Sequence, residues 1–454
     1  MKKVLVPLIL LCSILSAQSQ LKIPYTRHLL SNGLNVILHE DHSTPTVTVN
    51  TWYHVGSGYE KPGRTGFAHL FEHLMFMGSG HVAEGQFDKL LEANGGNNNG
   101  STTEDRTNYY EDVPTNALEL ALYLDSDRMG FLIDAMTPKS VDAQRDVVKN
   151  ERRQSYENRP YGLSEETILK NLYPANHPYN WSVIGSMADL SAATFEDVVE
   201  FFRTYYVPNN ASLVIAGDIN PKETLKLVEK WFGGIPMGKP VPPQNPAAVN
   251  LNEEKILVME DRVQLPRLYM TWITPPKFTP GDAEMDVLAN ILSGGKNSRL
   301  YQKLVYELQI AQDVRASQSS SKLSSQFQII VTARSGHTLE ELKKVIQQEI
   351  DKIKNEAPAK RELQRTVNQY EASFLDGLEK AGGFRGKGNQ LNEYFYYAGN
   401  PDYVNEDLSR YKALNVDDIQ TAAQTYLPNN GRVILSIVPQ GKTDLAVQPK
   451  ADGK

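Results

Sequence analysis

The chain has 454 residues, of which 40% are hydrophobic and 22% are charged, and its formal net charge at pH 7 is −7. This length and balance are ordinary for globular domains and are sufficient for two hydrophobic cores. Because the net charge is negative, the chain lacks the positive field of a nucleic-acid-binding protein, and we expect no nucleic-acid partner.

Residues 1–19 are the first recognisable element. Lys2 and Lys3 precede an apolar run from Val4 to Ala17, and small residues follow where a signal peptidase would cut. This pattern is typical of a secretory signal peptide and predicts secretion across the inner membrane, to the periplasm or the exterior. The apolar run is too short for an ordinary membrane span, and no later segment reaches about 18 apolar residues, so we expect no span.

Cys12, the single cysteine, lies inside this predicted signal peptide. A lipoprotein signal would need a small residue before the acylated cysteine, whereas Leu11 stands there, so the sequence does not favour a lipoprotein. Cleavage near Ser19 would leave a mature chain without cysteine, and we therefore expect no disulfide in the fold.

The remaining sequence repeats itself at a constant offset of 220 residues, from 36 to 256. Segment 36–41 resembles segment 256–261, and YVPNN at 206–210 recurs as YLPNN at 426–430. Several short matches at one offset are the signature of an internal duplication. The sequence therefore predicts two homologous domains.

The predicted domain boundaries follow from this duplication. Segment 236–250 is rich in proline and has no helical period, as an extended linker should. We expect a first, catalytic domain over 20–235 and a second, non-catalytic domain over 251–440. A polar tail occupies 441–454.

Strand-like runs and longer helical stretches alternate within the first repeat. Strands are expected over 35–38 and 46–53, and helices over 115–131, 141–156 and 195–205. Both kinds of element in one domain predict an α+β fold, in which helices pack on one face of a mostly antiparallel sheet.

The segment GFAHLFEHLMFMGSG, at 66–80, contains the strongest chemical motif. His69 and His73 are four residues apart, so on a helix they lie one above the other, with Glu72 on the same side. Burying these three groups among apolar neighbours without a shared partner would be costly. Two such imidazoles can bind one metal ion, beside which the glutamate would lie. An amphipathic core helix, the alternative, explains only the apolar residues.

Two histidines leave a zinc ion short of protein ligands, because catalytic zinc sites usually have three and keep one position open. The best candidate for the third ligand is Glu151, on the second predicted helix. An H-x-x-E-H motif followed at this distance by a helix ending in Asn-Glu resembles the pitrilysin/insulinase family of zinc metallopeptidases, the inverzincins. The surrounding sequence is similar to bacterial members related to the mitochondrial processing peptidase.

This resemblance implies a duplicated α/β-roll that spans nearly all of the mature chain. It implies one Zn²⁺ per chain, bound by His69, His73 and Glu151 as in the family. It further implies a zinc-dependent endopeptidase that hydrolyses peptides or short unfolded segments, with Glu72 as the general base that activates the metal-bound water.

The glycine- and asparagine-rich stretch after residue 93 has two interpretations. Composition alone makes it a flexible turn. In the family, the strand that matches Asn99, Gly100 and Ser101 is a sheet edge to which peptide substrates add as an extra strand. Both interpretations stay open at this point.

The second repeat is predicted not to bind metal. The positions that correspond to His69, Glu72 and His73 are occupied by Ala289, Leu292 and Ser293, none of which is a zinc ligand. Since two domains form only half of the closed chamber of single-chain family members, we expect a homodimer, or a heterodimer with a non-catalytic homologous subunit.

One position departs from the family pattern. Many members have a second glutamate seven residues before the third ligand, whereas this chain has Gln144. Glutamine keeps the hydrogen-bonding ability but not the charge. The arginine and tyrosine with which family members hold the substrate have no match that we can place in this chain.

Two other functions remain compatible with the sequence. A non-enzymatic assembly or substrate-binding subunit would keep the fold, although inactive relatives generally lose part of the motif. A periplasmic metal-binding protein would use His69, His73 and Glu151 without needing Glu72. The peptide hydrolysis and metal content of a Glu72→Gln protein distinguish these functions from a peptidase.

Overall fold

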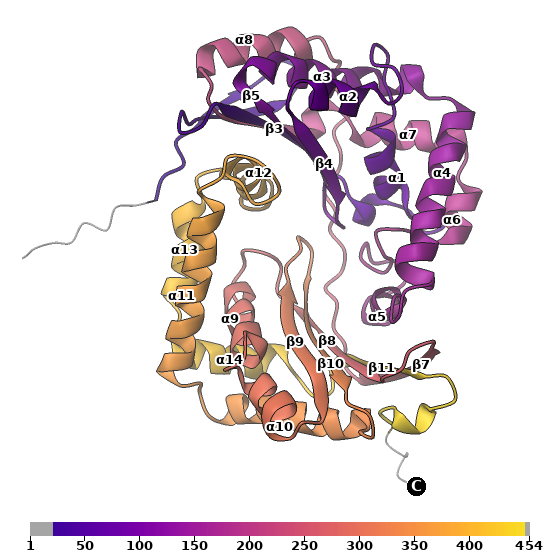
Figure 1. The fold of residues 1–454 in the computed structure, drawn as a ribbon, viewed down its shortest axis with the longest axis vertical. Coiled ribbons are helices and arrows are strands. Elements are labelled where there is room, and N and C mark those ends of the chain that lie inside the picture. The colour runs from indigo at the N-terminus through magenta and orange to yellow at the C-terminus, as the bar shows by residue number, and fades with distance from the viewer. Residues whose placement is uncertain (1–20, 450–454) are drawn as a thin grey trace, which may run out of the picture.

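The computed structural model describes residues 21–449, which form an upper and a lower half in Figure 1, each built on one β-sheet. The predicted signal peptide and Cys12 lie outside the described residues. Within the described part of the chain, no helix combines the length and the apolar character needed to cross a bilayer.

The first half contains a six-stranded sheet in the order β1-β2-β6-β3-β5-β4. Neighbouring strands are antiparallel except β2 and β6, which run parallel, so the sheet is mostly antiparallel as predicted. The strands are β1 (Thr26–Leu29), β2 (Asn35–Glu40), β3 (Thr46–Tyr53), β4 (Asn97–Thr102), β5 (Thr107–Pro114) and β6 (Ala211–Gly217). Every residue of the central strand β6 is buried, which explains why its sequence, ASLVIAG, is apolar or small throughout instead of alternating.

Most helices of the first half cover one face of this sheet and enclose the larger part of its core. Phe71 of α1 packs against the rings of Phe201 and Phe202 on α7. Helix α1 also contacts β4 and β5 of the sheet. The helices are α1 (Phe67–Leu74), α2 (Gln86–Ala93), α3 (Leu118–Ala135), α4 (Pro138–Arg152), α5 (Ser164–Leu172), α6 (Met187–Ala192), α7 (Phe195–Tyr205) and α8 (Pro221–Phe232).

The second half repeats this topology with five strands in the order β7-β11-β8-β10-β9. The pair β7 and β11 is parallel, like β2 and β6, and Trp272 on β8 is buried at the position that Trp52 occupies on β3. The strands are β7 (Glu254–Asp261), β8 (Arg267–Thr274), β9 (Ala311–Ser319), β10 (Ser325–Ala333) and β11 (Arg432–Pro439). The helices are α9 (Asp282–Ser293), α10 (Leu339–Asn355), α11 (Lys360–Gly377), α12 (Lys387–Ala398), α13 (Val404–Lys412) and α14 (Val416–Tyr426). Two such units in one chain confirm the predicted α+β fold.

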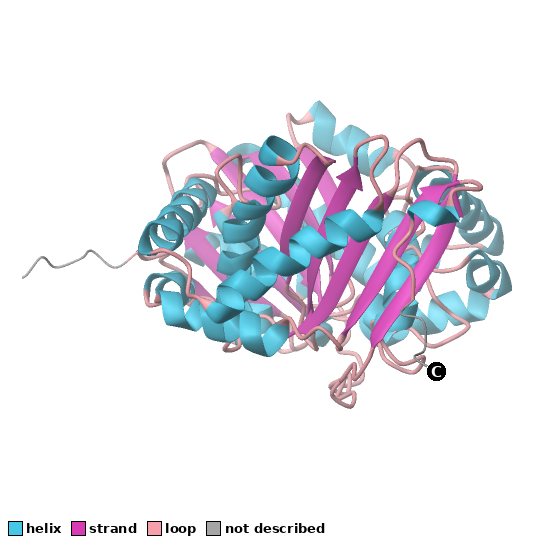
Figure 2. Ribbon diagram, turned by 90° about the horizontal axis from the view of Figure 1, so that it is seen from below, coloured by secondary structure: helices cyan, strands magenta, loops and turns pink. Residues whose placement is uncertain are grey.

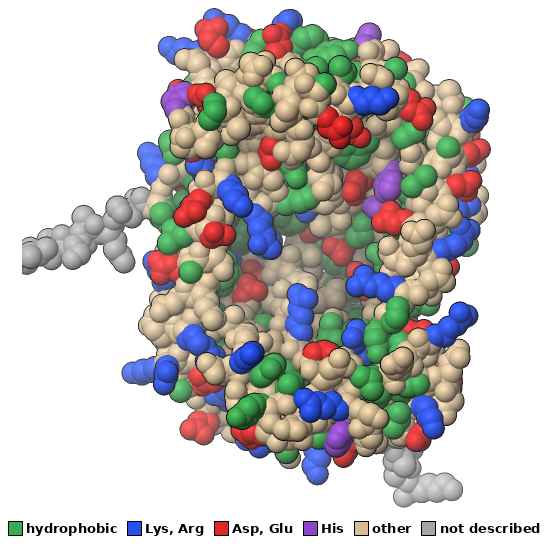
Figure 3. Space-filling model, in the orientation of Figure 1, with side chains coloured by type: hydrophobic (Ala, Val, Ile, Leu, Met, Phe, Trp, Pro, Cys, Tyr) green, Lys and Arg blue, Asp and Glu red, His purple; other side chains and the backbone are tan. Residues whose placement is uncertain are grey.

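Each half also lends one helix to the opposite face of the other half's sheet. Helix α12 packs on β3 and β6 of the first sheet, and α5 packs on β8 and β11 of the second. Figure 2, turned by 90°, shows the strands of the sheets with helices lying across them. The two exchanged helices join the halves around a central hollow, which the space-filling view shows between them (Figure 3).

The core beneath the first sheet contains a buried ion-pair network centred on Arg128 of α3. Its guanidinium lies 2.5 Å from a Glu111 oxygen and donates a 2.6 Å hydrogen bond to Asp125. Arg128 is 1% exposed and both carboxylates are fully buried, and of the cations in residues 21–449 it alone forms ion pairs with them.

Replacing Arg128 with methionine is expected to lower the free energy of unfolding by about 3–5 kcal/mol, because it leaves two carboxylates buried without a counter-charge. Urea denaturation at constant metal concentration measures this loss. Arg203→Met, on the exposed face of α7, is the matched control and should change stability by less than about 0.5 kcal/mol. Equal stability of the two variants would show that the network contributes nothing.

Candidate metal centre

Helix α1 presents its polar residues to the hollow and its apolar residues to the core. Phe67, Leu70, Phe71 and Leu74 are buried, whereas His69, Glu72 and His73 are partly exposed on the opposite side. This is the amphipathic pattern that the sequence predicts, with the H-x-x-E-H residues on the face away from the core.

The start of α1 is fixed by a residue that the sequence analysis missed. Both carboxylate oxygens of Glu60 accept hydrogen bonds from the helix start, one from the Gly66 N–H at 2.9 Å and one from the Ala68 N–H at 2.8 Å. Gly66, at the N-cap position, has no side chain that could cap the helix, so the Glu60 carboxylate caps it instead. No spacing rule identifies such a cap, because Glu60 stands outside the usual capping-box positions.

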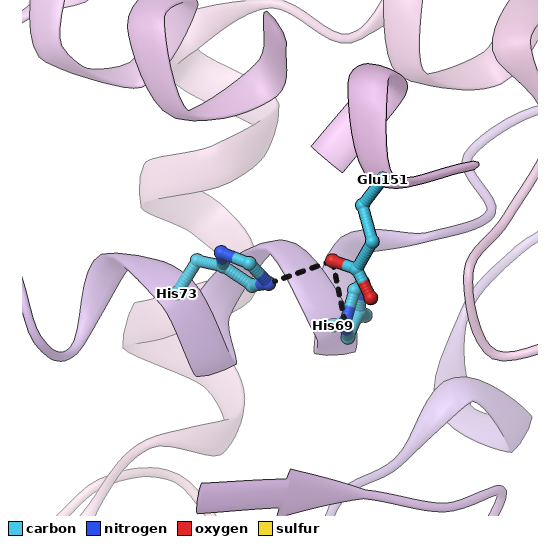
Figure 4. Close-up of side chains that lie close together, drawn as sticks. All are labelled: His69, His73 and Glu151. Atoms are coloured by element: carbon cyan, nitrogen blue, oxygen red, sulfur yellow. Dashed lines mark ion pairs between the residues drawn. The ribbon is translucent and has the colours of Figure 1, made fainter. Parts of the chain in front are cut away.

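Glu151, near the end of α4, reaches the two imidazoles of α1 from a separate helix (Figure 4). One of its oxygens lies 3.3 Å from Nε2 of His73 and 3.7 Å from Nε2 of His69. The three side chains can place one donor atom each within 4.8 Å of one another. The structure therefore brings together the three residues that the sequence predicts as ligands, from segments that are far apart in the chain.

These donors fit a zinc ion in both geometry and protonation. Ligands at about 2.0–2.1 Å around a tetrahedral zinc lie about 3.3 Å from one another, close to the 3.3 Å and 3.7 Å that separate the Glu151 oxygen from the two imidazole nitrogens. Burial, aided by the neighbouring His73, lowers the pKa of His69 to about 4, which keeps that imidazole neutral and able to donate its lone pair. A hydrogen bond from His73 lowers the pKa of Glu151, which keeps it ionised. The arrangement has three protein donors, as catalytic zinc sites usually do.

Glu72 projects beside this cluster and is held by β4. The Thr102 hydroxyl donates a 2.6 Å hydrogen bond to a Glu72 oxygen. Burial raises the pKa of Glu72, and the Thr102 hydrogen bond opposes this rise. A Cβ atom at Gly100 would lie 3.2 Å from Cγ of Glu72 and 3.1 Å from the ring of Tyr109, so a side chain at this position would displace Glu72 or Tyr109 by a few tenths of an ångström.

The stretch that contains Asn99, Gly100 and Ser101 is a regular strand, not the flexible turn that composition alone suggests. It belongs to β4, which ends the sheet order and, within the described part of the chain, pairs with β5 alone. Ser101 donates a 2.6 Å hydrogen bond to Asn108 on β5, which helps to fix the strand. An edge strand beside the cluster offers backbone groups to a further strand.

Gln144, the departure from the family pattern, lies two turns before Glu151 on α4. Its amide nitrogen donates to the sulfur of Met77, just beyond the end of α1. The side chain thus links α4 to the segment that follows the motif, but it adds no negative charge next to the cluster.

Two adjoining cavities extend from the cluster into the hollow between the halves. The first, of about 420 Å³, is lined by His69, Glu72, Thr102 and Glu151 among others. The second, of about 680 Å³, shares Glu151 with the first and continues to β8, β9 and β10 of the second half. The candidate centre therefore opens into space that both halves enclose.

An α+β fold with an inverted H-x-x-E-H helix, and a carboxylate from a second helix as the third candidate ligand, indicates the metallopeptidase class. Comparison with known proteins agrees. The family model for insulinase, peptidase family M16, matches residues 35–182, and the model for the M16 inactive domain matches residues 192–370. The chain belongs to the insulinase family of peptidases, family M16.

Relatives of similar length are named as proteases. The chain is 28% identical to the zinc protease PqqE of Helicobacter pylori over 417 residues, covering 90% of this chain and 92% of that protein. Its fold matches the crystal structure of a protease from Helicobacter pylori with a TM-score of 0.86 and 25% identity, covering 92% of this chain and all of that one. The periplasmic protease PqqL of Escherichia coli matches with a TM-score of 0.77 and 18% identity, and the match covers 94% of this chain but 49% of PqqL.

Proposed function

We propose that the protein is a zinc-dependent endopeptidase that cleaves peptides or short unfolded segments. One observation carries this proposal: three donor side chains converge on one point, and a separate carboxylate, Glu72, lies beside them without being part of the cluster. A protein that only bound metal would not need Glu72 held in this position. Relatives named as zinc proteases support the same activity.

In the proposed reaction, His69, His73 and Glu151 hold the ion, and Glu72 moves the proton. Bound zinc would polarise the carbonyl of the scissile bond and acidify a water molecule towards a pKa of about 7. Glu72 accepts the proton from this water and delivers it to the leaving amine, as a general base and then a general acid. Its burial and raised pKa suit this exchange of roles.

Asn99, Gly100 and Ser101 are proposed to hold the substrate. A peptide that pairs with the free edge of β4 would run alongside α1 and close to Glu72. Such pairing requires an extended chain, so folded proteins are excluded as substrates. The test is digestion of an unstructured peptide mixture beside folded proteins of similar composition, with products identified by mass spectrometry; digestion of the folded proteins would contradict the proposal.

Thr102→Val is expected to lower kcat by about tenfold, because the variant keeps the shape of the side chain but removes a hydrogen bond to a charged group. Zinc content and KM should change little. Thr103→Val, one residue further along, is the matched control, since the Thr103 hydroxyl contacts the β4–β5 turn and not Glu72. An unchanged kcat in Thr102→Val would mean that the hydroxyl does not position the base.

We further propose that residues 20–235 form a catalytic domain and residues 251–440 a non-catalytic one. Two chains would pair into one assembly, in the periplasm or outside the cell. The match to about half of PqqL supports pairing, because two chains of this length would equal one such protein. Light scattering of the purified chain tests the assembly. A monomer with full activity would contradict it.

A further inference from the structure

The 680 Å³ cavity beyond the candidate metal centre contains an arginine that forms no ion pair with any carboxylate of residues 21–449. Arg267, at the start of β8, lines this cavity together with Glu151. Its Nε donates a 2.9 Å hydrogen bond to the Thr332 hydroxyl, which in turn donates to Asp313 at 3.1 Å. Among residues 21–449, no aspartate or glutamate forms an ion pair with Arg267, so its two Nη groups are free to bind a ligand.

The guanidinium lies over an aromatic ring. Its central carbon lies 3.8 Å from the ring centroid of Tyr161. With the ring on one face and Thr332 at Nε, the position and plane of the guanidinium are fixed before a ligand arrives. This geometry leaves the planar pair of Nη donors that binds carboxylates in a bidentate manner.

Tyr161 is itself constrained. Its backbone has a φ of 61°, in the left-handed region that a residue with a bulky side chain rarely adopts. Its N–H donates to Asp261 at 2.8 Å, and its hydroxyl donates to the Leu265 carbonyl at 2.7 Å. Strained residues of this kind cluster at binding sites, where the surrounding contacts hold them in place.

Charges are distributed unevenly along the two joined cavities. Glu104 and Glu165 line both of them at the end near the metal centre, and burial raises the pKa of Glu104 to about 7. Arg159 and Arg267 line only the second cavity, which reaches the second sheet. Since burial disfavours the ionised forms of Glu104 and Glu165, the two arginines are the main charges facing a ligand, and they attract a substrate carboxylate to the second end. Figure 3 shows acidic and basic side chains around the hollow between the halves.

We propose that Arg267 is a subsite for a carboxylate group of the peptide substrate, provided either by its C-terminus or by an aspartate or glutamate side chain. This proposal rests on the proposed function, because it names the substrate feature that the cavity next to the metal centre selects. The neutral lining of the cavity, which includes Ser319, Ser320 and Gln328, would accept the intervening polypeptide without selecting its side chains.

The test measures binding, so that it does not depend on turnover. Fluorescein-labelled short peptides of random sequence, free of aspartate and glutamate, are prepared with a C-terminal acid and with a C-terminal amide. A third set is amidated but carries one internal glutamate. Fluorescence anisotropy with the zinc-loaded Glu72→Gln protein should show tighter binding of the acid set, or of the glutamate set, than of the plain amide set.

Arg267→Gln should weaken binding of the preferred set by about 10- to 100-fold and leave binding of the plain amide set nearly unchanged. Arg267→Lys keeps the charge but loses the planar pair of donors, so its affinity for the preferred set should lie between those of the parent and Arg267→Gln. Arg262→Gln, on the exposed turn after β7, is the charge-matched control and should retain the preference.

Two results would overturn the proposal. The first is equal binding of the three peptide sets. The second is tighter binding of a carboxylate-containing set that persists in Arg267→Gln, which would occur if the zinc ion itself bound the carboxylate. If Arg267→Gln does not fold, Arg267→Lys is measured with the same three peptide sets, and an undiminished preference in that variant would overturn the proposal. A chain without peptidase activity that still shows the Arg267-dependent preference would contradict the proposed function and not this subsite.

Discussion

Glu72→Gln is expected to lose nearly all peptide hydrolysis while it still binds zinc. Glu72 lies outside the ligand cluster, so its replacement leaves His69, His73 and Glu151 in place. The amide cannot accept a proton, and removing a general base lowers kcat by roughly 10²- to 10⁴-fold, or more when the same group also protonates the leaving amine.

The measurement pairs steady-state kinetics on one peptide with metal analysis of the same sample. Glu92→Gln, at an exposed position of α2, is the matched control and should keep full activity. Loss of zinc from Glu72→Gln would place this residue among the ligands. Retained turnover would show that Glu72 is not the general base, whereas zinc binding without any turnover in the parent protein would favour a metal-binding or assembly protein over a peptidase.

Glu151→Gln is expected to lose zinc affinity and, with it, activity. The Glu151 oxygen lies 3.3 Å and 3.7 Å from the two imidazole nitrogens, where a shared ion would be bound. The near-isosteric amide removes the negative charge and a strong oxygen ligand. Removing a residue that only hydrogen-bonds to a metal ligand lowers metal affinity by about 10- to 100-fold. Removing a ligand itself should therefore lower zinc affinity by more than about 100-fold.

Competition with a chromogenic chelator gives the zinc dissociation constants of the parent and the variant. Asp146→Asn, on an exposed turn of the same helix, is the control for a general effect of charge on α4. If Glu151→Gln bound zinc as tightly as Asp146→Asn does, the third ligand would have to be another residue.

The part of the centre that lies on one helix could be predicted directly from the sequence. His69, Glu72 and His73 share a face of α1 because helical spacing puts them there, and no tertiary contact is required. Glu151 was predicted through the family resemblance, since nothing local relates α4 to α1. The strand over 46–53 and the helix over 195–205 agree with β3 and α7 at both ends, because their patterns are strong and their caps are clear.

The contacts that support the centre could not be predicted, because each joins segments whose approach depends on the whole fold. Glu60 caps α1 through a loop, and Thr102 reaches Glu72 from an edge strand. Arg267 meets Tyr161 across the two halves. The exchange of α5 and α12 was not predicted either, since an apolar face indicates that a helix is buried but not which sheet buries it.

The central claim is that one zinc ion, bound in the first half, makes this chain a peptidase. Metal analysis and peptide hydrolysis on one purified sample, before chelation, after chelation and after zinc is restored, test it most directly. The account predicts one zinc per chain, loss of hydrolysis on chelation and recovery when one equivalent returns. Two zinc ions per chain, or full hydrolysis after complete removal of metal, would contradict it.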